Sequence, residues 1–85
     1  MTKYTPQMQE AFRGIPSPVK GFVLDVVEYK SYIGLRLYRD NVDKLRTSDK
    51  VSVAEYLYLV RDTFKAHGAK VQFERVDGAP PNLGN

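Results

Sequence analysis

Few side chains in this sequence could carry out chemistry, and they do not gather into a catalytic pattern. There is one histidine, His67, and no cysteine, so neither a nucleophile–base pair nor a zinc site finds its usual groups. His67 directly precedes Gly68, at the end of a predicted helix, where the helix dipole favours a charged histidine. We therefore interpret His67 as a helix-terminal residue, and we expect no catalytic residue and no cofactor.

Two further patterns were candidates for ligand binding. The run Asp40-Asn41-Val42-Asp43 is faintly similar to a calcium loop, but it lacks the glycine at the sixth position, and Val51 stands where the loop needs glutamate. A capping and loop cluster explains this run better, so we expect no metal site. The six glycines form no phosphate-binding loop. These observations predict a protein that is not an enzyme.

Residues 22–38 contain the side chains best suited to binding. β-Branched and aromatic residues dominate this stretch, which predicts a β-hairpin. If Lys30 and Ser31 form the turn, Val26 lies opposite Leu35 and Asp25 lies opposite Arg36; a loop over 30–33 is the alternative and keeps the same faces. The predicted core face of the hairpin is aliphatic and consists of Leu24, Val26, Ile33, Leu35 and Leu37. Gly34 indicates a bulge or space for the side chain of Val27 or Tyr32.

The opposite face of the hairpin combines tyrosines with an arginine, the residue types enriched at interface hot spots. We predict that this face is exposed and binds a partner. The candidate partner-binding residues are Val27, Tyr29, Tyr32, Arg36 and Tyr38. The alternative is that the N-terminal arm, residues 1–20, lies across this face with Phe12 and Ile15.

A short helix and a long helix flank the hairpin in the sequence. Thr5 and Pro6 predict the start of the short helix, and Gly14 its end in a left-handed conformation. Ser52 and Glu55 form a capping box that predicts the start of the main helix over 52–67. Val51 and Tyr56 are placed as its hydrophobic staple, and Gly68 is placed to end it. The predicted core stripe of this helix is Val53, Leu57, Val60 and Phe64.

A third strand is predicted over 70–76, with Val71 and Phe73 in the core, followed by a flexible tail over 79–85. The expected fold is a single α+β domain over residues 1–78 in the order α-β-β-α-β, with a three-stranded, mostly antiparallel sheet covered on one face by the main helix. We expect strand order 2-1-3; a third strand beside the second would instead be parallel to it.

The distribution of charge bears on the class of partner. The net charge is +3, but basic and acidic residues are interspersed instead of forming one basic patch. With no long apolar run and no cysteine, we expect a cytoplasmic protein that has no membrane partner. A homodimer is plausible, because a chain of 85 residues has a thin margin of stability.

Taken together, these features predict a protein-binding module that acts as a small regulator or inhibitor. The alternative is a single-stranded nucleic-acid-binding protein that stacks bases on the same tyrosines. The small size, the lack of cysteine and the lack of familiar motifs would also suit a virus-encoded accessory or host-takeover protein. That last interpretation rests on general character and not on particular residues.

Overall fold

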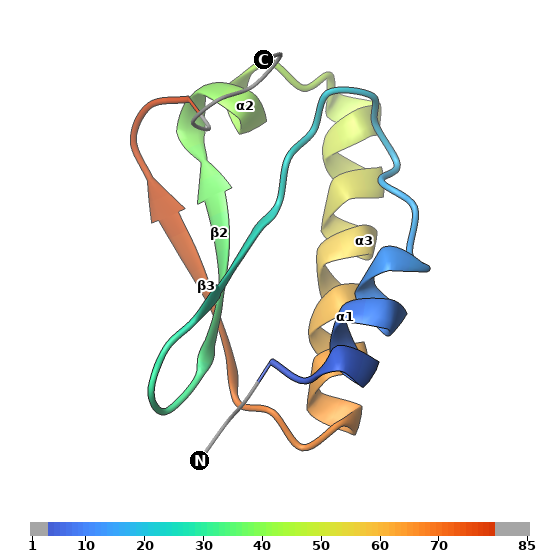
Figure 1. Cartoon of the computed structure of the whole chain (residues 1–85). Coiled ribbons are helices and arrows are strands. Elements are labelled where there is room, and N and C mark those ends of the chain that lie inside the picture. Colours follow the sequence, from blue (N-terminus) through green and yellow to red (C-terminus); the bar gives the residue numbers. More distant parts are fainter. Residues whose placement is uncertain (1–3, 80–85) are drawn as a thin grey trace.

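The computed structural model describes residues 4–79, which form a three-stranded sheet with helices on one side. In chain order the elements are α1 (Pro6–Arg13), β1 (Asp25–Glu28), β2 (Ile33–Tyr38), α2 (Arg39–Asp43), α3 (Thr47–Ala66) and β3 (Val71–Val76). Figure 1 shows α1 and α3 packed on the same side of the sheet, with α2 at the end of β2. The predicted α+β class is confirmed. Ala79 apart, the tail predicted over 79–85 lies outside the described residues.

The hairpin forms with the predicted register. β1 and β2 are antiparallel, with Val26 opposite Leu35 and Asp25 opposite Arg36. The Tyr29 N–H donates to the Tyr32 carbonyl oxygen at 2.9 Å, which closes the ladder just before the Lys30-Ser31 turn. The burial of the aliphatic face explains the agreement, since a shift by one residue would turn that whole face toward solvent.

The predicted strand order 2-1-3 is wrong: the sheet has the order β1-β2-β3, and β3 is parallel to β2. The direction of β3 follows from α3, which has 20 residues and carries the chain back about 30 Å to the end where β2 begins. The position of β3 follows from β2. Ile33, Leu35 and Tyr38 on both faces of β2 are buried, whereas β1 has charged residues at both its ends. The most apolar strand takes the centre, and the charged strand takes an edge.

The main helix begins five residues earlier than predicted, at Thr47. Ser52 does not cap it, because its hydroxyl donates to the Ser48 carbonyl oxygen at 3.4 Å within the helix. Residues 47–51 contain no glycine or proline, so the helix continues upstream of Ser52 through them; the Lys50 N–H donates to the Arg46 carbonyl oxygen at 2.9 Å. The predicted end is confirmed, since Gly68 follows the helix with a φ of +87°.

The predicted staple and part of the predicted core differ in the structure. Val51, predicted to form a staple with Tyr56, is 58% exposed, whereas Tyr56 is buried in the core. Phe73, predicted as a core residue, is 39% exposed, because β3 is an edge strand at the margin of the area that α3 covers. The buried apolar core contains Met8, Phe22, Ile33, Leu35, Leu37, Val53, Tyr56, Val60, Phe64 and Ala69.

The N-terminal arm packs on the core side and not on the other face of the hairpin. Thr5 Oγ1 accepts the Met8 N–H at 3.2 Å, so the predicted N-cap is confirmed. The rings of Tyr4 and Phe12 lie 5.6 and 5.9 Å from the ring of Phe64. Gly14 has a φ of −75°, so the predicted left-handed end is wrong; an ordinary helical residue ends α1.

A methionine in α1 tests how strongly the arm contributes to stability. Met8 is 1% exposed. Met8→Ala should lower the free energy of unfolding by about 2–5 kcal/mol, because it leaves a cavity in the buried core. Urea denaturation followed by circular dichroism measures this. Gln7→Ala, on the exposed side of α1, should change the value by less than about 0.5 kcal/mol. Equal effects of the two substitutions would contradict the docked arm.

Candidate functional site

The outer face of the sheet, the side opposite α1 and α3, is the candidate site. Figure 1 shows none of the described helices over it. The register places on this face Asp25 and Val27 of β1, Gly34, Arg36 and Tyr38 of β2, and Gln72, Glu74 and Val76 of β3, with Tyr29 and Tyr32 at the hairpin end. The candidate residues therefore share one face, and the arm leaves this face open within residues 4–79.

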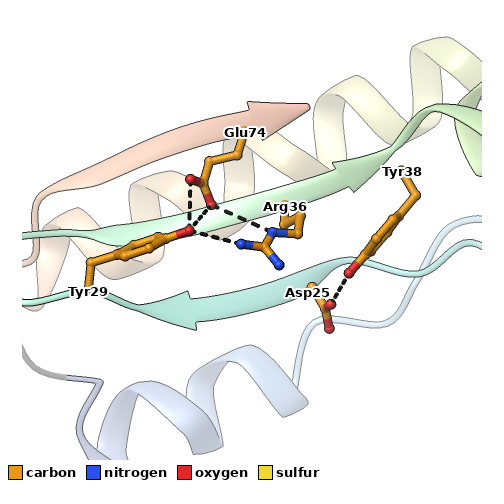
Figure 2. Close-up of polar contacts among 5 residues, drawn as sticks. All are labelled: Asp25, Tyr29, Arg36, Tyr38 and Glu74. Atoms are coloured by element: carbon orange, nitrogen blue, oxygen red, sulfur yellow. Dashed lines mark hydrogen bonds and ion pairs between the residues drawn. The ribbon is translucent and has the colours of Figure 1, made fainter. Parts of the chain in front are cut away.

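Tyr29, Arg36 and Glu74 form a hydrogen-bonded network on the outer face (Figure 2). The Tyr29 hydroxyl lies 2.9 Å from both carboxylate oxygens of Glu74, to which it donates, and it accepts a hydrogen bond from Arg36 Nη2 at 2.9 Å. Arg36 Nε lies 3.9 Å from Glu74 Oε1, too far for a hydrogen bond, and is buried without a partner. The tyrosine thus bridges the guanidinium and the carboxylate and fixes both.

A second pair and a ring stack extend the network. The Tyr38 hydroxyl donates to Asp25 Oδ2 at 2.5 Å, across the β1–β2 ladder. The rings of Tyr29 and Tyr32 stack with centroids 4.6 Å apart and planes inclined by 22°. Each aromatic side chain of the outer face is therefore held by a neighbour in one orientation.

Gly34 makes room for this arrangement. The ladder is regular at this position, with Gly34 opposite Val27 and Gln72, so the predicted bulge is absent from the β1–β2 pairing. A Cβ atom at residue 34 would overlap Glu74 Oε1 and lie only 2.7 Å from Tyr29 Cε2. The glycine provides space for Tyr29 and Glu74, and not for the residues named from the sequence, Val27 and Tyr32.

Burial differs among the five predicted binding residues. Val27, Tyr29 and Tyr32 are half-buried, and 32% of the Arg36 side chain is exposed. Tyr38 is only 6% exposed, so it can support Asp25 but offers little surface to a partner. Glu74 is the important residue that the sequence analysis missed. With the third strand placed beside β1, Glu74 would have been two strands away from Arg36.

The outer face carries more negative than positive charge. One guanidinium, Arg36, faces two carboxylates, Asp25 and Glu74, within the described residues. Burial raises the pKa of Tyr32, and the charge of Glu74 raises it further. The hydrogen bond to Asp25, followed by burial, raises the pKa of Tyr38. Both phenols therefore remain neutral donors throughout the physiological range.

A groove on the helix side was not predicted from the sequence. It has a volume of about 530 Å³ and lies where β2 and β3 end, between α2 and the first half of α3. Leu37, Val53 and Leu57 contribute apolar lining, and the charged lining residues are of both signs: Arg39, Lys50 and Arg75 are basic, and Asp43 and Asp77 are acidic. Only the pairing of β2 with β3 creates this groove, so the predicted strand order concealed it.

Between residues 4 and 79, no three histidine or acidic side chains lie close enough together to hold a metal ion. His67 Nδ1 lies 2.9 Å from the Thr63 carbonyl oxygen, which can only accept, so this nitrogen donates. Of the helices in this part of the chain, none has the length and apolar character to cross a membrane.

Substitution of Gly34 tests the close packing of the network. Gly34→Ala should lower the free energy of unfolding by about 1–3 kcal/mol, because the added methyl group displaces Glu74 and Tyr29. Chemical denaturation measures the effect. Gly14→Ala is the matched control, since its Cβ would meet no atom closer than 3.5 Å and its φ is ordinary, so it should be neutral or stabilising. If Gly34→Ala leaves the free energy of unfolding unchanged, this packing is contradicted.

The raised pKa of Tyr38 predicts a pH dependence of stability. The folded state holds the phenol proton more tightly than the unfolded state, so this contribution is complete below pH 10.0 and is lost as the pH rises through the folded-state pKa. Unfolding free energies measured between about pH 9 and pH 11.5 should therefore fall, and Tyr38→Phe should make the fall shallower. Identical slopes for the two proteins would show that the Asp25 bond does not hold this proton.

Comparison with known proteins yields no match: no protein-family model, no curated protein and no solved structure is significantly similar to this chain.

Proposed function

We propose that this protein is a non-enzymatic binding module that recognises another protein through the outer face of its sheet, acting as a small regulator or inhibitor. The observation that carries the proposal is a sheet face that the described helices leave open and that presents the half-buried residues Tyr29, Tyr32 and Arg36. Tyrosine and arginine provide much of the energy at protein interfaces, because they combine large apolar area with polar groups.

The network supports this role through preorganisation. Binding normally costs free energy when side chains lose rotamer freedom at an interface. Tyr29 is already fixed by Glu74 and Arg36, and Tyr32 by its stack on Tyr29. A partner would therefore meet a surface that has little freedom left to lose, so more of the contact energy contributes to affinity.

The charge of the outer face favours a protein over a nucleic acid. A stacked pair of tyrosines could receive a base, which is the strongest argument for the alternative. However, Asp25 and Glu74 neutralise Arg36 and would repel phosphates, whereas binding to phosphates depends on an excess of positive charge. A partner with its own apolar and basic groups complements this face better.

The test is affinity capture from a lysate of the source organism, followed by calorimetry with the purified partner. Tyr32→Ala should weaken binding by roughly tenfold or more, as is typical of a tyrosine hot spot. It leaves the hydrogen bonds of Tyr29 in place. Leu59→Ala on the exposed side of α3 is the control and should bind normally.

Two results would overturn the proposal. One is a partner whose affinity is the same for Tyr32→Ala and for the unchanged protein. The other is tight, salt-dependent binding of short single-stranded oligonucleotides in fluorescence anisotropy, which would establish the nucleic-acid alternative instead.

A further inference from the structure

β3 presents a long edge that has no neighbour within residues 4–79. It pairs with β2 on one side over six residues, Val71–Val76. The Ile33 N–H donates to the Lys70 carbonyl oxygen at 2.8 Å. In a parallel ladder, successive residues of a strand point their N–H and C=O groups alternately to one side and to the other. This hydrogen bond therefore shows that the even-numbered residues of β3 direct their backbone groups to β2. The N–H and C=O groups of Val71, Phe73 and Arg75 consequently point outward, ready to pair with another strand.

Exposed aromatic residues lie beside this free edge. Phe73 is 39% exposed and Tyr58 of α3 is 53% exposed, and their rings meet edge to face with centroids 6.3 Å apart. The Arg61 guanidinium lies 4.8 Å from the centre of the Tyr58 ring. These three residues form the edge cluster, which follows β3 on the helix side of the sheet.

The sequence of β3 can pair with a second copy of itself in an antiparallel register centred on Phe73. If the two copies are related by a twofold axis perpendicular to the sheet, their helices lie on the same side of the joined sheet. Each residue of one β3 must then lie opposite a residue of the other β3 that belongs to the same face. With Phe73 opposite Phe73 of a second copy, Val71 lies opposite Arg75 and Gln72 opposite Glu74. The outward groups of Val71, Phe73 and Arg75 then meet as hydrogen-bonded pairs, with on the order of six backbone hydrogen bonds in all.

Charge disfavours the neighbouring register that is centred on Glu74. If the strands shift to bring Glu74 opposite Glu74, two carboxylates oppose each other across the new ladder, which is destabilising. The register centred on Phe73 instead gives an amide–carboxylate pair on the outer face. On the helix side it brings the two edge clusters together, so Phe73 and Tyr58 lose their exposure to water.

We propose that two copies of this protein associate through β3 in an antiparallel pair centred on Phe73, which joins their sheets into one sheet of six strands. The outer faces of both copies then lie on the same side of that sheet and remain open. Association depends mainly on Phe73 and on the backbone groups of the β3 edge, whereas partner binding depends on Tyr29, Tyr32 and Arg36, so either can fail without the other even though Glu74 lies at both surfaces.

Sedimentation velocity over a concentration series tests the dimer. The unchanged protein should shift from monomer to dimer as the concentration rises. Phe73→Asp should weaken dimerisation by roughly tenfold or more, because it replaces two facing aromatic rings with two facing carboxylates. Phe73 is already partly exposed, so this variant should remain folded, as circular dichroism can confirm. Leu59→Asp, also on an exposed position, is the control and should still dimerise.

Cysteine cross-linking tests the register, because the chain has no cysteine of its own. Under mild oxidation, an equimolar mixture of Gln72→Cys and Glu74→Cys should form a disulfide-linked heterodimer, since these residues oppose each other at a separation that suits a disulfide. Either variant alone should cross-link much less. The proposal is overturned by a monomer at millimolar concentration, by a dimer that tolerates Phe73→Asp, or by preferential linkage of Glu74→Cys to itself.

Discussion

The burial of β2 on both of its faces is the constraint on which the rest of the structure depends. Ile33 and Leu35 are completely covered on the helix side, and Tyr38 is covered on the other. A strand buried in this way must have neighbours along both edges, so β1 and β3 are placed on either side of it. The parallel pairing with β3 then requires a long connection, which α3 provides while covering the helix side of the sheet.

The core depends on segments that are distant in the sequence. Phe64 near the end of α3 is fully buried between the sheet and the rings of Tyr4 and Phe12. On the same side, Asn41 of α2 accepts the Val23 N–H at 2.9 Å and donates to the Gly21 carbonyl oxygen at 3.0 Å, which ties the start of the hairpin to the end of β2. In this small domain, almost every described segment therefore helps to cover one face of the sheet.

The hairpin could be predicted from local sequence patterns, whereas the strand order could not, because it depends on tertiary packing. The register of β1 and β2 follows from alternation along 22–38, and the cap at Thr5 and the end at Gly68 follow from single residues. The start of α3 was missed because Ser52 and Glu55 fit a capping box equally well inside a helix. Strand order depends on which strand is buried on both sides, and that is a property of the whole sheet.

The candidate site was predictable in composition but not in detail. The sequence placed Val27, Tyr29, Tyr32, Arg36 and Tyr38 on one face, and the register agrees. It could not indicate that Glu74 joins Tyr29 and Arg36, because that contact depends on the neighbour of β2. Nor could it indicate the burial of Tyr38, which results from its position on the central strand beside Asp25. Contacts between strands distant in sequence were the missing information.

Among the described elements, the parallel partner of β2 is also the last to be synthesised. A ribosome adding about 5–20 residues per second releases the hairpin and then α3 while one edge of β2 is still bare. During that interval the nascent chain exposes the backbone groups that β3 will later occupy, next to the aliphatic residues of the future core. Translation therefore passes through a stage in which one edge of β2 can still pair with another strand.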